Sequence, residues 1–174
     1  PGSFCYGADP EQRDRFRSTQ AHNTIQVGGL EQNRIEPGYT FRLFPGSRIR
    51  RALLDPTHAA VRFEGAIDYS GVRHTRRIAA ESAPTRWRVE DTVASDRPAE
   101  AVIRFHLAPG LDGDPNAIRD RAGRVRARLE PAGYCLIPEP YEYSPEYGVK
   151  LAAVRLVGRF AVGTRPVDVA LTII

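Results

Sequence analysis

The chain has 174 residues, of which 41% are hydrophobic and 26% are charged, as in an ordinary soluble globular domain. No apolar run is long enough to cross a membrane, and with only two cysteines, Cys5 and Cys135, neither a disulfide framework nor a four-cysteine zinc site is available. Because the sequence starts at Pro1 and contains no methionine, we expect it to be an internal piece of a longer precursor.

The net charge of +4 favours a polyanionic partner, either nucleic acid or an acidic polysaccharide. Lys150 is the only lysine, so nearly all of the positive charge is arginine, which a GC-rich genome would also produce. Arginine suits carboxylate or sulfate recognition, because its planar guanidinium binds such groups through two parallel hydrogen bonds. The densest basic run, residues 119–128, has no interleaved aromatic residues for base stacking, so we expect no nucleic-acid partner.

The predicted elements begin with a short helix over residues 8–16, where Asp9 can cap the first turn and Pro10 suits its first position. Alternation of apolar and polar residues then predicts a series of strands. They cover residues 24–27, 39–44, 60–64, 66–69, 72–78, 86–93, 101–107, 124–129, 134–137, 152–161 and 167–174.

Short strands at intervals of about ten residues, separated by Gly, Pro and Asp, are typical of an antiparallel sandwich. Gly65 predicts a bulge between two strands, residues 112–116 a loop, and Gly123 the turn of a hairpin. Arginine fills many polar alternation sites, which favours sheets with one solvated face. We therefore predict an all-β fold, an antiparallel β-sandwich of roughly ten to twelve strands, in one domain over residues 1–174.

The segment most suggestive of chemistry places His22 and Asn23 at the start of the strand predicted over residues 24–27. Neutral imidazole binds zinc well, and a position just before a strand allows a rigid approach from a loop. The alternative is a histidine hydrogen-bonded at the end of a strand, because nothing nearby in the sequence supplies further ligands.

Residues 16–27 read Phe-Arg-Ser-Thr-Gln-Ala-His-Asn-Thr-Ile-Gln-Val. They resemble the pattern Arg-Ser-Thr-x-Ala-His-Asn-Thr-(Val/Ile)-x-Val-x-Gly of heparinase II/III-like polysaccharide lyases. Residues 1–6, Pro-Gly-Ser-Phe-Cys-Tyr, are similar to the Pro-Gly-Thr-Tyr-x-Tyr segment upstream in that family. Thinner similarity extends to the later strand segments 71–78, 87–91 and 104–109. The sequence departs from the commonest version at Cys5 and Gly28, and neither change touches the His-Asn-Thr core.

The resemblance implies one zinc ligand in this chain. In the family, zinc is held by the second histidine of a His-x-His motif, by an aspartate just before the Pro-Gly segment, and by the histidine of the His-Asn-Thr motif. Only the last of these matches a residue here, His22. The aspartate would fall immediately before Pro1, and the His-x-His motif further upstream. By itself His22 should bind zinc weakly or not at all, since a stable site usually needs three or four ligands.

The resemblance also implies a partner domain and a reaction. The family cleaves acidic, uronate-containing polysaccharides by β-elimination, with key catalytic residues on an N-terminal α/α-toroid that this chain lacks. This chain would be the C-terminal sandwich of such an enzyme, forming part of the substrate cleft and inactive by itself. We expect a periplasmic or secreted bacterial protein, with no membrane partner.

Two residues of the motif are candidates for substrate binding. Arg17 would present its guanidinium to a uronate carboxylate, and an ion pair with Asp14 or Glu31 is the alternative. Asn23 would orient a ligand, or it would cap the turn instead.

The remaining histidines and the tyrosine-rich segment favour structural roles. His58 falls in a turn, and His74 and His106 sit within strand patterns, where a cross-strand hydrogen bond is the default. Residues 139–147 alternate tyrosine and glutamate near prolines, which is typical of a strand at a sandwich edge, although such aromatic rings also stack on sugars. Cys5 and Cys135 form either one disulfide or two separate thiols.

Two further classes of function remain open. One is a β-sandwich that binds polysaccharide without cleaving it and needs no zinc. The other is a structural sandwich that packs against a helical domain and has no affinity for glycans. No nucleophile elbow, phosphate-binding loop or dinucleotide fingerprint points to another enzyme class.

Overall fold

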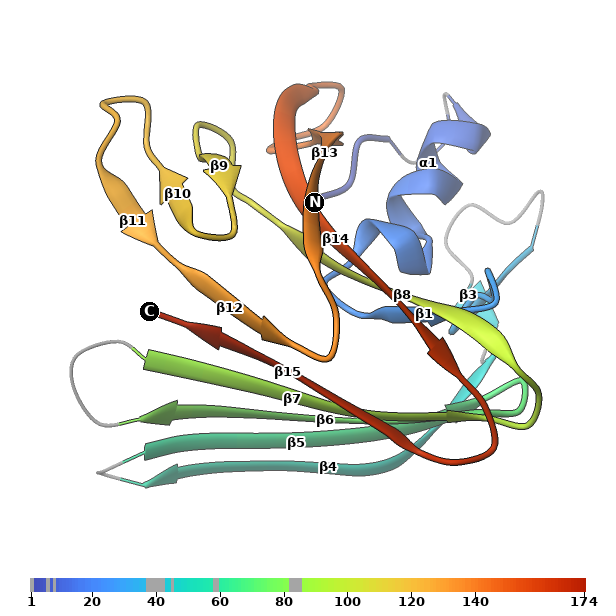
Figure 1. Cartoon of the computed structure of the whole chain (residues 1–174). Coiled ribbons are helices and arrows are strands. Elements are labelled where there is room, and N and C mark those ends of the chain that lie inside the picture. The colour runs from blue at the N-terminus through green and yellow to red at the C-terminus, as the bar shows by residue number, and fades with distance from the viewer. Residues whose placement is uncertain are drawn as a thin grey trace.

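A computed structural model describes residues 2–5, 7, 9–36, 43–44, 46–57, 60–81 and 86–174. Two antiparallel sheets pack face to face (Figure 1), which confirms the predicted all-β antiparallel sandwich. Fifteen strands lie in the described part of the chain, more than the ten to twelve predicted, because several of them have only two to four residues. Parts of the similarity and strand predictions, together with His58, lie outside the described residues. These parts are Pro1, Tyr6 and residues 39–42.

The larger sheet has six strands in the order β12-β15-β7-β6-β5-β4. These are β4 (Ser47–Thr57), β5 (Ala60–Tyr69), β6 (Val72–Glu81), β7 (Arg86–Ser95), β12 (Leu129–Ala132) and β15 (Val167–Ile173). Its outer face is charged, and Arg77 on β6, for example, pairs with Glu64 on β5 at 2.8 Å between Nε and Oε2. This arrangement confirms that arginines occupy a solvated sheet face.

The smaller sheet has four strands in the order β1-β8-β14-β13, which are β1 (Ile25–Val27), β8 (Ala99–His106), β14 (Leu151–Val162) and β13 (Leu136–Tyr143). A three-stranded ribbon and a two-stranded ribbon complete the described strands. They comprise β9 (Asp112–Asp114), β10 (Ala117–Arg119) and β11 (Val125–Ala127), and then β2 (Arg34–Ile35) and β3 (Leu43–Phe44). The ribbon β10–β11 forms the hairpin predicted around Gly123, whose φ is 78°.

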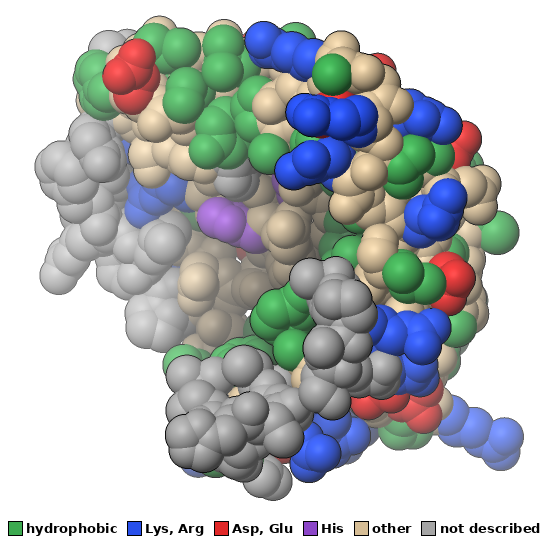
Figure 2. Space-filling view, turned by 90° about the vertical axis from the view of Figure 1, so that its left-hand side faces the viewer, with side chains coloured by type: hydrophobic (Ala, Val, Ile, Leu, Met, Phe, Trp, Pro, Cys, Tyr) green, Lys and Arg blue, Asp and Glu red, His purple; other side chains and the backbone are tan. Residues whose placement is uncertain are grey.

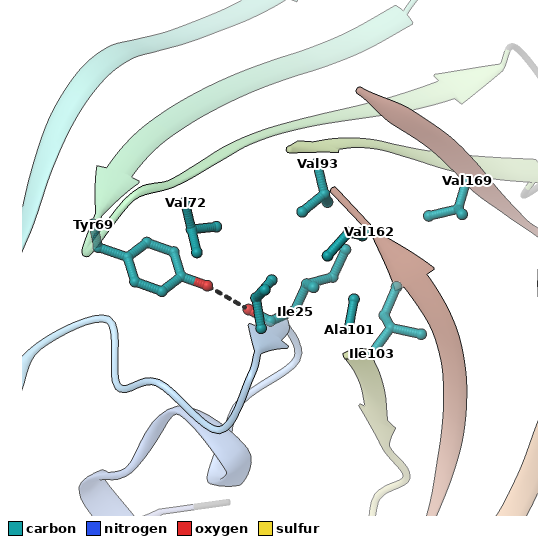
Figure 3. Packing of buried hydrophobic residues seen from close by; sticks show 9 residues of the cluster. Ile25, Tyr69, Val72, Val93, Ala101, Ile103, Val162 and Val169 are labelled. Atoms are coloured by element: carbon teal, nitrogen blue, oxygen red, sulfur yellow. Dashed lines mark hydrogen bonds between the residues drawn. The ribbon is translucent and has the colours of Figure 1, made fainter. Parts of the chain in front are cut away.

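The core lies between the two sheets. One buried cluster joins Ile25, Ile103 and Val162 of the smaller sheet to Val72 and Val93 of the larger one (Figure 3). The hydroxyl of Tyr69 on β5 donates to the backbone oxygen of Ile25 at 3.4 Å, and its burial raises its pKa to about 12. At the other end of the core, a second cluster packs Leu156 against Val89 and Leu171.

The helix α1 (Pro10–Arg17) lies against the smaller sheet (Figure 1). Its bounds confirm the predicted helix, because Asp9 is the N-cap and accepts a hydrogen bond from the Gln12 backbone at 3.0 Å, with Pro10 next. On the sheet side, Lys150 donates to the Gln12 side chain at 2.7 Å, and Arg15 pairs with Glu142 at 2.8 Å. These contacts hold α1 over β13 and the start of β14.

Three local predictions were wrong. The bulge lies at Arg50 on β4 and not at Gly65, since β5 runs unbroken through Gly65 while the β4–β5 register shifts between Ile49 and Arg51. Residues 112–116 are not all loop, because β9 pairs with β10 there. The eleven-residue strand β4 was not predicted at all over most of its length.

Candidate functional site

The His22–Asn23 corner connects a single turn of 3-10 helix, η1 (Thr19–Ala21), to β1. His22 ends that turn in an extended conformation, with its backbone nitrogen donating to Thr19 O at 3.2 Å. Both His22 and Asn23 are exposed, whereas β1 directly after them is fully buried. The segment therefore presents two polar side chains at the boundary between solvent and core.

The hydroxyl residues around the corner fix its shape. The backbone nitrogen of Gln32 donates to Thr19 Oγ1 at 2.9 Å, and its side-chain nitrogen donates to Thr24 Oγ1 at 3.0 Å. The carboxylate of Glu31 accepts from the Thr19 backbone nitrogen at 2.6 Å. Much of the sequence pattern that predicts the site is thus a clamp that holds the corner rigid.

Asn23 joins the corner to β8. Its Oδ1 accepts two hydrogen bonds from His106, one from the backbone nitrogen at 2.8 Å and one from Nδ1 at 2.9 Å. A backbone N–H can only donate, so the side-chain atom at this position must be the oxygen. Asn23 therefore acts structurally on His106, and its amide nitrogen is the group left for a ligand.

The same geometry fixes the state of the His106 ring. Because Nδ1 faces an oxygen that is an acceptor, Nδ1 carries the proton. Burial, assisted by the nearby charge of Arg155, lowers the pKa of His106 to about 4, so the ring is neutral at pH 7 and Nε2 keeps a free lone pair. Nε2 is buried and makes no hydrogen bond within the part of the chain that the structure describes.

On the opposite side, the corner is tied to the larger sheet through a buried carboxylate. Asp91 accepts from Arg76 Nε at 2.7 Å and Nη2 at 2.9 Å, and it lies 2.7 Å from His74 Nε2. Burial alone would raise the pKa of Asp91, but these hydrogen bonds outweigh it and lower the pKa. Arg76 Nη1 also donates to the backbone oxygen of Asn23.

A polar chain therefore runs from one sheet to the other through the corner. The expected cross-strand hydrogen bond of His74 is present, and His106 bonds to the residue that leads into the neighbouring strand. Sequence reasoning missed Arg76 and Asp91, although both carry a weak signal, since each is a charged residue on the apolar phase of its strand.

Arg17 lies at the end of α1 with most of its side chain covered. Its Nη1 is 3.5 Å from Asp14 Oδ1, so the ion pair considered as an alternative forms with Asp14, while Glu31 bonds to Thr19 instead. Asp14 is also held by Arg13, through Nε at 2.7 Å. Contact between Arg17 and a substrate stays a prediction.

Two adjoining pockets surround His106. The first is lined by His22, Asn23, His106, Tyr141 and Tyr143. The second lies beside α1 and shares His106 and Tyr141 with the first. Tyr141 packs edge-on against the His106 ring, with ring centres 4.7 Å apart. From the left-hand side of Figure 1, the surface is hollowed and histidine side chains lie within the hollow (Figure 2). As predicted, the tyrosine-rich segment forms an edge strand, β13.

The described residues do not form a complete zinc site. His22 is the predicted ligand, and burial is the main cause that lowers its pKa, so its imidazole is neutral at pH 7 as metal binding requires. Among the residues that the structure describes, however, no three His, Cys, Asp or Glu side chains gather in a metal-binding group. No step of the chemistry is therefore derived through zinc here.

The cysteines are separate free thiols. Cys5 is buried and lies 3.2 Å from the backbone oxygen of Asp9, and Cys135 is exposed. Among the described residues, no helix has the length and apolar character needed to span a bilayer.

The fold defines the class of protein. Residues 2–5 and 9–174 share an architecture with sandwich regions of solved lyases, for instance the heparan sulfate lyase HepC from Pedobacter heparinus, with a TM-score of 0.75 and 14% identity over 99% of this chain and 27% of that one. A heparinase III structure gives a TM-score of 0.73 and 15% identity over 99% of this chain and 26% of that chain. A second heparinase III gives 0.69 and 12% identity, over 97% and 25%.

The sequence defines the family. Residues 1–166 match the family described as heparinase II/III-like, C-terminal, and the chain belongs to that family. No curated protein matches the chain. The chain spans about a quarter of the length of the solved structures to which it is similar.

Proposed function

We propose that this chain is the C-terminal sandwich of a polysaccharide lyase that cleaves uronate-containing polysaccharide, such as a glycosaminoglycan or alginate, by β-elimination. The observation that carries the proposal is the exposed His22–Asn23 corner, held rigidly by both sheets within a chain of this family. Rigid support on both sides is what a substrate-binding wall requires. In this proposal, an N-terminal α/α-toroid forms the opposite wall of the cleft.

The reaction places one electrostatic demand on the enzyme. A base removes the C5 proton of the uronate, an acid protonates the leaving oxygen, and the substrate carboxylate must be neutralised while negative charge develops beside it. The toroid would supply the base and the acid. Arg17 would contribute positive charge toward the carboxylate, and Asn23 would donate its amide N–H to the sugar.

Zinc belongs to the same proposal. His22 would be one ligand, and residues outside this sequence would be the others, since a stable site needs three or four. Bound zinc would organise the wall of the cleft and add positive charge there. Because a polymeric substrate of this size stays outside the cytoplasm, we propose a periplasmic or secreted location.

A non-catalytic carbohydrate-binding or structural module is the second candidate. The observation that favours binding is the pair Tyr141 and Tyr143, which lines the pocket at His22 and offers aromatic rings to a sugar. In that case binding would need no zinc, and replacing His22 would leave the affinity for glycans unchanged.

The test is an assay of the parent enzyme and of this chain alone on uronate polymers, followed by the ultraviolet absorbance of unsaturated products. We expect product from the parent and none from the chain alone. Product from the isolated chain would refute the assignment of the catalytic groups to another domain. Binding without product by the parent would favour the non-catalytic module.

A further inference from the structure

The pocket beside α1 has a defined polar wall. It lies between the helix and strands β8, β13 and β14, and its lining includes Arg15, Gln20, His106, Tyr141 and Arg155. Through His106 and Tyr141 it adjoins the pocket at His22 and Asn23. A chain of sugars bound at the His22–Asn23 corner would therefore have this pocket as its neighbouring position.

The first polar atom of this wall is an acceptor. His106 Nδ1 is committed as a donor to Asn23 Oδ1 at 2.9 Å, so Nε2 of the neutral ring carries a lone pair and no proton. This atom is buried without a hydrogen bond to the described residues. A buried acceptor in that state costs free energy unless a donor reaches it.

The second polar atom is a donor. Arg155 lies directly opposite His106 in the β8–β14 register. Its Nη2 pairs with Glu139 at 3.0 Å, whereas its Nε is buried and makes no hydrogen bond within the described part of the chain. A guanidinium is always protonated, so this Nε–H can only donate.

One donor and one acceptor on facing positions select the chemistry of the ligand. A hydroxyl group accepts and donates at once, so it satisfies Arg155 Nε–H and His106 Nε2 together. A carboxylate or sulfate only accepts, and it would press its oxygen against the lone pair of Nε2. Glu142, which also lines the pocket, further disfavours an anion.

We propose that this pocket is a subsite for a sugar hydroxyl, held between Arg155 Nε and His106 Nε2. The inference rests on the proposed function, because it assigns this position to the polysaccharide that binds at the corner. Water has the same hydrogen-bonding capacity, and the experiment must separate water from a sugar hydroxyl.

The test uses NMR of the full chain with ¹⁵N-labelled histidine, in which the chain's four histidines give four ring systems. A His106→Gln variant assigns the His106 signals. The probes are cellobiose, which carries hydroxyl groups and no charge, and inorganic sulfate, which is an anion without a donor at pH 7. We expect cellobiose to shift the His106 Nε2 resonance at up to about 100 mM, a range that detects millimolar affinity, and sulfate to leave it unchanged.

The matched variants are Arg155→Lys and Arg159→Lys. Arg159 lies on the same strand and also pairs with Glu139, at 3.3 Å, but its side chain is exposed. Arg155→Lys keeps the charge and removes Nε–H, so it should weaken cellobiose binding about tenfold, as expected for one lost hydrogen bond in a buried site. Arg159→Lys should leave the dissociation constant unchanged.

Three outcomes overturn the inference: no shift with cellobiose, which means that water alone occupies the pocket; an equal shift with sulfate; or equal effects of the two variants. Lyase activity of the parent is measured separately. An active parent whose chain shows no cellobiose shift disproves only the subsite. An inactive parent whose chain shows the expected shifts disproves the lyase and leaves a hydroxyl-binding pocket.

Discussion

The most consequential residue in the described structure is Asp91, whose side chain is 1% exposed and yet ionised between His74 and Arg76. A buried charge is tolerated only while its partners are present. Because Arg76 also bonds to the backbone of Asn23, the same arginine neutralises the core and fixes the corner. Stability and site geometry are therefore coupled at this position.

Replacing Arg76 by alanine should cost about 3–5 kcal/mol of folding free energy, because it leaves the buried carboxylate without its main counter-charge. The matched control is Arg77→Ala on the outer face, where the exposed pair with Glu64 should contribute about 0–1 kcal/mol. Urea unfolding of both variants measures the difference. Equal losses would show that Asp91 does not depend on Arg76.

His106 should make stability depend on pH. Its pKa is about 4 in the fold and 6.5 as its ordinary value, so between these values the unfolded chain binds more protons than the folded one. Stability is therefore fully present above pH 6.5 and falls as pH decreases toward about 4, by at most about 3 kcal/mol at about 1.4 kcal/mol per pH unit.

Unfolding of the wild type and of His106→Gln, followed from pH 7 to about pH 4, isolates this contribution, since the variant lacks the titrating ring. The carboxylate of Asp91, with its lowered pKa, weakens both proteins in the same direction at still lower pH. Parallel curves for the two proteins would show that His106 is not the group responsible.

At the residue scale, the sequence predicts only what is local. His22, Asn23 and Arg17 stand within one continuous pattern, so their type and spacing could be recognised. Arg76 is 53 residues from its partner Asn23, and His106 is 83 residues away. No spacing rule connects residues that meet only after both sheets have formed.

Among the elements, the ribbon β9–β10 depends on one glycine. Gly113 has φ of 125°, and a Cβ placed there would lie 2.2 Å from the backbone oxygen of Ala117. Gly123 also has a positive φ, 78°, but a Cβ there would contact nothing within 4 Å. The two positions separate backbone strain from steric collision.

Gly113→Ala should therefore destabilise the chain more than Gly123→Ala does. Gly123→Ala carries only the conformational cost, about 1–2 kcal/mol, and Gly113→Ala adds a collision that forces the backbone of β10 to shift, for a total of about 3 kcal/mol or more. Thermal unfolding of the two variants tests this order. The reverse order would mean that the ribbon adapts freely at Gly113.

At the element scale, alternation of apolar and polar residues was the signal, and it failed where the backbone breaks the alternation. In β4 the bulge at Arg50 shifts the phase of the pattern, so residues 47–57 show no clean period of two. The regular strands β6, β7 and β14 were found within three residues of their ends, because they alternate through unbroken registers. The fold class thus followed from the majority of strands, and the strand count did not.

At the scale of the whole molecule, the sandwich is a support whose polar corner faces outward. The two sheets meet the corner from opposite sides, through Arg76 on one and His106 on the other. The resemblance placed His22 in a zinc site, and the described residues supply no group of three ligands around it. The completeness of the zinc site is thus a property of the parent protein, not of this domain.

This reasoning gives the last prediction. The parent protein should bind about one zinc ion per chain, and His22→Ala should reduce its affinity at least about 100-fold, because a site with three protein ligands loses one of them. The isolated chain should hold zinc weakly or not at all. Competition with a chromophoric chelator measures both proteins, and Arg77→Ala in the parent is the control for a general effect of substitution. Retention of tight zinc binding by the His22→Ala parent would place the metal elsewhere, and the corner would then serve the substrate alone.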